Sequence, residues 1–138
     1  MRGALAMSVP AVDYFAVFMA AVASMIVGTI WYTAFGKVWF RAARMSPAMA
    51  RPLPAIIATA FLCELVMALI FAVLLGHFEG YTLADALASA VFLWIGFIAT
   101  TVIANTRNQG FAWDLPLIDG GHWFFVLLAQ GAILGAFQ

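Results

Sequence analysis

Four long stretches of the chain are almost free of charge, and short polar stretches separate them. They cover about residues 14–36, 54–76, 86–105 and 120–137. Inside them Glu64 is the only side chain with a formal charge at neutral pH, and His122 is the only histidine. A helix needs about 20 apolar residues to cross a hydrocarbon core about 30 Å thick. The pattern therefore predicts four transmembrane helices in an all-α integral membrane bundle, a single domain over residues 1–138.

The polar stretches between these helices are short, at about residues 36–53, 77–85 and 106–119. Consecutive helices are therefore expected to be antiparallel neighbours. Within the first connection, residues 38–45 place aromatic side chains beside two arginines, a pattern typical of an interfacial amphipathic helix. A cleaved signal peptide is the alternative for the first segment, because Arg2 precedes an apolar run, but that run is longer than such a signal needs.

The composition agrees with a membrane protein, since 67% of the residues are hydrophobic and only 9% are charged. Soluble domains carry about a quarter of their residues as charges. Six basic residues balance six acidic ones, so the net charge gives no indication of a nucleic-acid partner. The single cysteine, Cys63, lies inside an apolar run and cannot form an internal disulfide.

The basic residues predict the orientation of the bundle. The first connection carries four of the six, the third carries one, and the second carries none. Basic residues near helix ends are retained in the cytoplasm, so the first and third connections are expected there and both termini outside. Arg2 is the one charge that does not fit this orientation.

Small residues at regular spacing predict where the helices touch, because they let two backbones approach closely within lipid. They occur in the first, second and fourth predicted helices, and each of these sets includes at least one glycine. A packing role explains all of them without any chemistry. The predicted packing residues are Ala16, Ala20, Ser24, Gly28, Ala68, Ala72, Gly76, Gly131 and Gly135.

Glu64 falls near the middle of the second helix, where an ionised carboxylate costs at least a few kcal/mol. Ser24, Trp94 and Gln130 fall at similar depth in the other helices, so a polar layer of these four residues inside the bundle is expected. Two interpretations of it remain open. Glu64 is either a neutral acid that joins helices by hydrogen bonds, or a group that changes protonation state during proton- or cation-coupled transport.

Asp119 and His122 lie three residues apart, so on a helix they share a face and form a weak candidate metal site. The simpler interpretation is that Asp119 caps the fourth helix while His122 and Trp123 lie at the headgroup level. No catalytic motif, haem attachment site or phosphate-binding loop is recognisable in the sequence. No catalytic residue is therefore predicted.

An aromatic cluster at the end of the first helix is expected to anchor it at the membrane interface, beside the first positive charges. The predicted anchor residues are Trp31, Tyr32, Lys37, Trp39 and Arg41. Gly28 and Gly36 bracket the cluster, and glycines inside a helix are costly unless something approaches closely.

Four segments together resemble one known family. They read "VGTIWYTAFGKVW", "LWIGFIATTVIAN", "TRNQGFAWDLPLIDGGHW" and "LLAQGAILGAF". These are similar to the DUF1761 family of small bacterial membrane proteins with four helices. Their most specific part is the Gly-x-x-Trp-Tyr…Phe-Gly-Lys-x-Trp pattern at residues 28–39. The resemblance implies a four-helix domain in the bacterial inner membrane and implies no activity.

Three functions are weighed for such a chain. The first is a non-enzymatic protein that acts by helix packing, as an accessory subunit of a larger membrane complex or as a homo-oligomer; its partners would be membrane lipids and other transmembrane subunits or copies of itself. The second is a small oligomeric transporter or channel that uses Glu64 for protons or cations. The third is a metal-dependent membrane enzyme at Asp119 and His122. Contact with lipid, quinone or pigment is compatible with the many phenylalanines, and none is specifically indicated.

Overall fold

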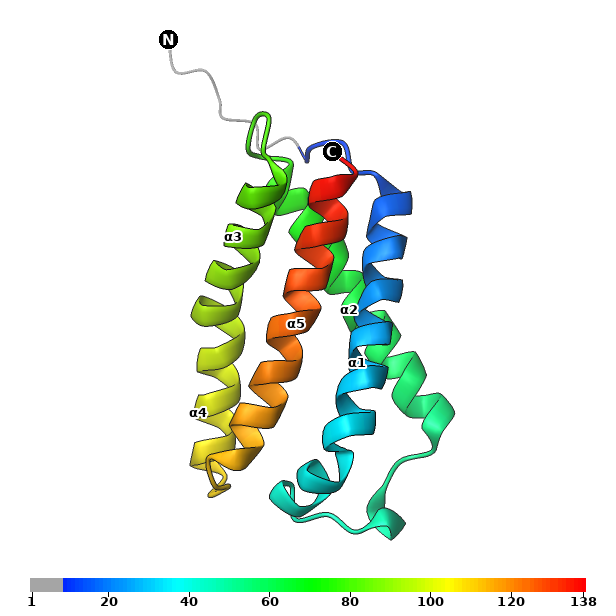
Figure 1. Cartoon of the computed structure of the whole chain (residues 1–138), viewed down its shortest axis with the longest axis vertical. Helices are drawn as coiled ribbons and strands as arrows, with labels where there is room; N and C mark the ends of the chain where they lie inside the picture. The colour runs from blue at the N-terminus through cyan, green and yellow to red at the C-terminus, as the bar shows by residue number, and fades with distance from the viewer. Residues whose placement is uncertain (1–8) are drawn as a thin grey trace.

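The structure is a computed structural model, and it describes residues 9–138. Arg2, which bears on the orientation and on the signal-peptide alternative, lies outside the described residues. The elements along the chain are helices α1 (Tyr14–Ala42), α2 (Leu53–Leu75), α3 (Leu83–Leu93), α4 (Thr100–Asn108) and α5 (Asp114–Ala136), with a short 3-10 helix η1 (Pro47–Met49) and a π-helix η2 (Trp94–Ala99) (Figure 1).

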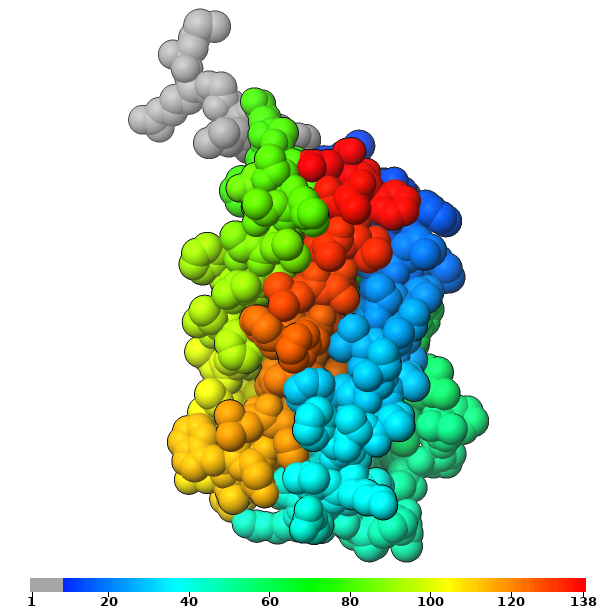
Figure 2. Space-filling view, viewed as in Figure 1, coloured from blue at the N-terminus to red at the C-terminus, as the bar shows by residue number. Residues whose placement is uncertain are grey.

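These elements form four rods that are long and apolar enough to cross a membrane, because α3, η2 and α4 are continuous from Leu83 to Asn108. The prediction of an all-helical, multi-pass membrane bundle is confirmed. Large apolar side chains, among them phenylalanine, isoleucine and leucine, are exposed along every rod, which is the outer surface expected of a protein surrounded by lipid. Figure 2 shows one face of this surface, on which α5 lies between α1 and the rod that begins at Leu83.

Two boundaries differ from the predicted ones. The segment expected to form a separate interfacial helix at 38–45 is instead the last part of α1, which runs without interruption to Ala42. Helix α5 begins at Asp114, six residues earlier than predicted. Pro116 lies in its first turn, where a helix needs no backbone N–H donor, so this proline starts the helix rather than excluding it.

Local capping explains where two of the helices begin. The carboxylate of Asp13 accepts hydrogen bonds from the backbone N–H groups of Phe15 and Ala16, at 2.9 and 3.1 Å. Thr82 and Asp85 form a reciprocal capping box at the start of α3. Such caps satisfy donors that the first turn of a helix leaves unpaired.

Helix α5 is the centre of the arrangement, with α1 on one side and the α3–α4 rod on the other (Figure 1). Helix α2 lies behind α1 and α5 in this view, and its beginning diverges from the bundle, so that residues 51–59 are all exposed. Apolar side chains of α1, α2, α3 and α5 form a core at the end of the bundle where α1 begins. Its buried members are Ala16, Val17, Ala20, Ala68, Phe71, Leu75, Ala86, Ala90, Leu127 and Leu134.

The predicted small residues separate into three groups. Those of α1 from Ala16 to Ser24, together with Ala68, are buried within this one chain. Gly131 and Gly135 let α5 approach α3, because a Cβ on Gly131 would lie 3.0 Å from the carbonyl oxygen of Ala86. Gly76 lies against Pro10. The small residues therefore serve contacts inside the bundle.

Candidate functional site

A cluster of polar side chains lies inside the bundle, next to the apolar core. Ser24 of α1, Glu64 of α2, and His122 and Gln130 of α5 are each at most 5% exposed. Glu64 is the central residue of α2 (Leu53–Leu75), so it lies about halfway along a rod that spans the membrane. Three different helices thus contribute polar groups to one buried region.

Gln130 joins these helices. Its side-chain amide donates to the hydroxyl of Ser24 at 3.0 Å and to the backbone carbonyl of Glu64 at 3.1 Å. The Ser24 hydroxyl in turn donates to the carbonyl of Ala20, one turn earlier in α1, at 2.9 Å. This part of the cluster is a structural tie between α1, α2 and α5.

The rest of the cluster lacks such partners. Among the described residues, no hydrogen-bond partner reaches Oε2 of Glu64, either ring nitrogen of His122, or Oε1 of Gln130. A buried polar group without a partner costs about 1–3 kcal/mol, and most proteins contain few of them. Four such atoms, on the three side chains Glu64, His122 and Gln130, lie in this region, which is a feature that helix packing alone does not explain.

Glu64 and His122 both lie beside Gly28 of α1, and we call them the buried pair, although no hydrogen bond joins their side chains. The position that a Cβ on Gly28 would occupy lies 3.2 Å from Nε2 of His122 and 4.0 Å from Oε1 of Glu64. Any larger residue at this position would press on the imidazole ring. By contrast, a Cβ on Gly36 would meet nothing within 4 Å. Of the two glycines that bracket the aromatic cluster, only Gly28 is explained by a close approach.

His122 is also in contact with a second polar group, at the side facing the end of α1. The centroids of the Tyr32 and His122 rings lie 5.0 Å apart. The hydroxyl of Tyr32 donates to Oδ1 of Asp119 at 3.0 Å, and the indole N–H of Trp39 donates to the same oxygen at 2.9 Å. The prediction that Asp119 caps the fourth helix is therefore wrong, since α5 begins at Asp114 and Asp119 binds side chains of α1 instead.

Trp31 adds a further hydrogen bond between α1 and α5. Its indole N–H donates to the backbone carbonyl of Ile118 at 3.1 Å. A Cβ on Gly121 would lie 2.9 Å from the Trp31 ring, so the absence of a side chain here lets this ring approach α5 closely. Trp31, Tyr32 and Trp39 all donate to α5, so their polar atoms hold two helices together in addition to any role at the membrane interface.

Four titratable side chains consequently follow one another through the bundle. The series runs from Glu64 to His122, then to Tyr32, and ends at Asp119 near the end of α1 that carries Lys37. In the opposite direction, beyond Ser24 and Gln130, the interior is the apolar core described above. Within this series, the hydrogen bond from Tyr32 to Asp119 is the direct polar link among the described residues.

Other predicted residues lie elsewhere. Trp94, placed by its depth in the polar layer, donates instead to the carbonyl of Gly120 at 2.8 Å, on the side of α5 that faces α3. Asp119 and His122 acquire no further ligand, since residues 9–138 hold no group of three or more His, Cys, Asp or Glu side chains able to bind a metal. Lys37 and Arg41 are exposed, as expected for residues near the membrane surface.

His122 is the member of the cluster that the sequence did not place there. It was expected at the headgroup level because the fourth helix was predicted to begin at residue 120. With α5 beginning at Asp114, His122 is in the third turn, roughly 12 Å along the helix axis. The available signal was spacing: His122, Val126 and Gln130 recur every four residues and share one buried face of α5.

Comparison with known proteins identifies the family and leaves its activity open. No curated protein and no solved structure matches the chain. One family model, described as a protein of unknown function (DUF1761), matches residues 15–135, which include all four membrane-spanning rods almost completely. The chain therefore belongs to the DUF1761 family.

Proposed function

We propose that this protein is a small proton-coupled transporter or channel of the bacterial inner membrane, active as an oligomer, in which Glu64 and His122 bind and release protons. The observation that supports this proposal is the buried pair beside Gly28: within residues 9–138, no hydrogen-bond partner reaches Oε2 of Glu64 or either ring nitrogen of His122. The sequence offered one intramembrane acid without a relay. The structure adds three further titratable groups in series with it.

The series of titratable groups from Glu64 to Asp119 also has a direction across the membrane. The connection after α1 and the one before α5 lie at the same end of the bundle, where Arg44 donates to the carbonyl of Gly110 at 2.7 Å. Five of the six basic residues lie in these connections or in the last part of the helices that lead into them, α1 and α4. The positive-inside rule therefore favours a cytoplasmic location for this end and an external location for both termini. In this orientation Asp119 and Tyr32 would exchange protons between the cytoplasm and the buried pair.

Glu64 and His122 carry the groups that would bind and transfer protons. A neutral imidazole accepts a proton at one nitrogen and donates one from the other, so His122 is suited to pass protons between Glu64 and Tyr32. Four helices do not enclose a pathway of their own, so the remaining half of the route would lie between subunits.

The decisive measurement is the protonation of Glu64. The chain has only two glutamates, Glu64 and Glu79, and two histidines, His77 and His122. Isotope labelling of glutamate, followed by infrared difference spectra between acidic and alkaline buffer, therefore reports on two carboxyl groups. The proposal expects a protonated carboxyl band that persists in Glu79→Gln and disappears in Glu64→Gln.

Proton movement is tested in liposomes that contain the purified protein and a pH-sensitive dye. An imposed potassium diffusion potential should drive a proton flux that is lost in Glu64→Gln and strongly reduced in His122→Asn. Glu79→Gln and His77→Asn, at exposed positions beyond the end of α2, serve as matched controls. A folded Glu64→Gln protein with the same flux and the same infrared spectrum as the wild type would exclude the proposal.

Association with other subunits is the second candidate function, and one observation favours it. Residues 51–59, which include the start of α2, are exposed on all sides, although the helix later joins the bundle. Such a segment offers a surface for a larger membrane complex or for a second copy of the chain. Isolation from native membranes in mild detergent, with mass spectrometry of co-purifying proteins, distinguishes the two. A larger subunit in fixed ratio supports the accessory role, and a homo-oligomer alone removes it.

A further inference from the structure

A groove lies between the α3–α4 rod and the first half of α5, on the other side of α5 from the buried polar pair. Its volume is about 360 Å³, and its lining is almost entirely apolar. Ligand sites in proteins span about 300–1,000 Å³, so this groove has room for one slender apolar group. Its lining residues include Trp94, Ala99, Ile103, Trp113, Leu117 and Gly120.

Two backbone features border this groove. The π-helix η2 (Trp94–Ala99) interrupts the rod at the groove, and segments of this kind often occur at functional sites. The hydroxyl of Thr100 donates to the carbonyl of Gly96 at 2.9 Å, which satisfies a backbone acceptor of the π-helix. On the opposite wall a Cβ on Gly120 would meet nothing within 4 Å. Gly120 therefore faces open space rather than a packed neighbour.

The groove opens on the outer surface of the bundle. Trp113, Leu117 and Ile103 all line it and are themselves exposed. In a protein that crosses the membrane, this surface faces lipid. The occupant that has direct access to the groove is consequently a lipid hydrocarbon chain.

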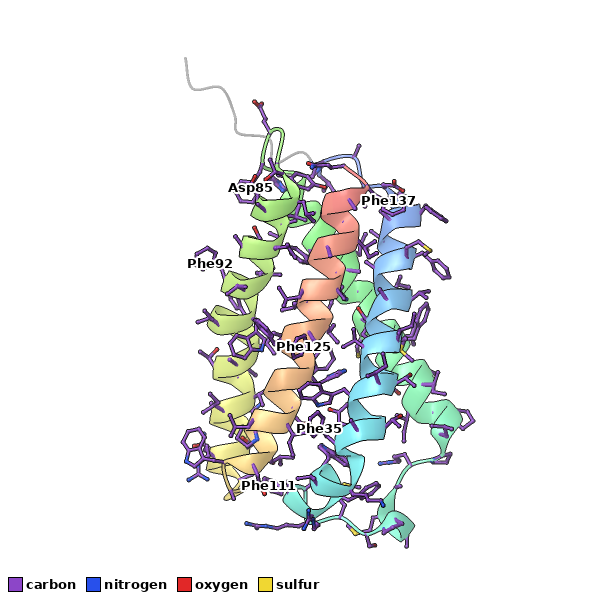
Figure 3. All side chains as sticks on the ribbon, in the orientation of Figure 1. Phe35, Asp85, Phe92, Phe111, Phe125 and Phe137 are labelled. Carbon is purple, nitrogen blue, oxygen red and sulfur yellow. The ribbon has the colours of Figure 1, made fainter. Side chains whose placement is uncertain are left out.

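Two arginines lie near the Trp113 end of the groove: Arg107 packs against this lining residue itself, and Arg44 packs against the neighbouring Gly110–Phe111 segment. The guanidinium of Arg107 stacks 4.9 Å from the ring of Trp113, and it donates to the carbonyl of Phe111. The guanidinium of Arg44 stacks 5.1 Å from the ring of Phe111, which Figure 3 labels at this end of the bundle. Guanidinium groups held in this way have further N–H donors available, and they are well suited to bind phosphate.

We propose that this groove binds one acyl chain of an anionic phospholipid, whose phosphate is held by Arg107 with support from Arg44. The apolar walls accept the chain, and the two arginines select the headgroup by charge. The lipid would thus occupy a defined position between the α3–α4 rod and α5.

The test compares nanodiscs of phosphatidylglycerol with nanodiscs of phosphatidylcholine. Brominated acyl chains quench tryptophan fluorescence at short range, and Trp94 and Trp113 line the groove. Quenching should be stronger with brominated phosphatidylglycerol than with brominated phosphatidylcholine, and most of the difference should disappear in Trp113→Phe. Native mass spectrometry in mild detergent should show a retained phosphatidylglycerol molecule for each chain.

Two variants separate the headgroup from the chain. Arg107→Gln should weaken retention of phosphatidylglycerol about three- to tenfold, with little change for phosphatidylcholine. Gly120→Leu should fill the groove and abolish retention of both lipids. The controls are Arg51→Gln, in an exposed connection, and Gly36→Leu, at a position where a Cβ meets nothing. Equal retention of both lipids, unchanged retention in Arg107→Gln, or a bound isoprenoid in place of phospholipid would each overturn the proposal.

Discussion

The contact between α3 and α5 depends on two glycines, and it supports a quantitative prediction for Gly131→Ala. The new Cβ would lie 3.0 Å from the carbonyl oxygen of Ala86 and 3.4 Å from its carbonyl carbon. Both atoms belong to the backbone of α3, which cannot rotate away as a side chain would. Overpacking of this kind costs about 1–3 kcal/mol, whereas replacing glycine by alanine inside a helix recovers about 0.5–1 kcal/mol. A net loss of about 1 kcal/mol is expected.

The matched control is Gly36→Ala in α1. Its Cβ meets nothing within 4 Å, so only the gain in helix propensity remains, about 0.5–1 kcal/mol in favour of the folded state. The two alanine variants should therefore shift the free energy of unfolding in opposite directions. Gly135→Ala is expected to behave like Gly131→Ala, because Leu83 and Ala86 both lie 3.0 Å from its Cβ.

The assay is reversible unfolding in mixed micelles of mild and denaturing detergent, followed by tryptophan fluorescence. The double variant at 131 and 135 should lose less stability than the two single variants together, since one outward shift of α3 relieves both clashes. The reasoning is refuted if Gly131→Ala is as stable as Gly36→Ala.

Three other predictions concern local contacts. Tyr32→Phe removes the hydroxyl that donates to Asp119, so it should cost about 1 kcal/mol in the same unfolding assay, whereas Tyr14→Phe, at an exposed site, should cost nothing measurable. Gly28→Ala should displace the imidazole of His122 and alter its nitrogen resonances but not those of His77; two unchanged histidine spectra would contradict the close approach. Thr82→Ala should cost about 0.5–2 kcal/mol and speed hydrogen exchange in the first turn of α3, because it removes one half of the capping box; equal exchange rates in both proteins would contradict this.

The hydrophobic pattern was sufficient to predict the number of rods and their approximate positions. A run of about 20 apolar residues has few alternatives to a transmembrane helix, because every backbone polar group must be satisfied within the segment. The hydrophobic pattern did not predict where α5 begins. The stretch from Asp114 to Asp119 has an aspartate at each end and a proline between them, so its composition resembles a loop. Asp119 is nevertheless accommodated inside α5 by hydrogen bonds from Tyr32 and Trp39 of α1, which a hydropathy pattern does not contain.

The candidate site could be predicted in part, because the sequence indicates how deep in the membrane each residue lies. The structure places Ser24, Glu64 and Gln130 together, through the Ser24 hydroxyl, the Glu64 backbone carbonyl and the Gln130 amide, because residues at equal depth on adjacent helices are able to meet. The prediction from depth failed for Trp94, because depth says nothing about which side of a helix a residue occupies. His122 was missed because its depth depends on where α5 begins, and an error of six residues moves a side chain by roughly 9 Å along the axis.

The position of Glu64 has an electrical consequence. It is the central residue of α2, and the apolar core separates it from the end of the bundle where α1 begins. A proton that reaches Glu64 from the Asp119 end therefore crosses roughly half of the transmembrane voltage, which corresponds to about 1 kcal/mol for each 100 mV. The occupancy of this carboxyl group would then change several-fold over the voltage range of an energised membrane, even at constant pH on both sides. The protonation state of Glu64 would therefore report the membrane voltage, with the proton as the charge that moves.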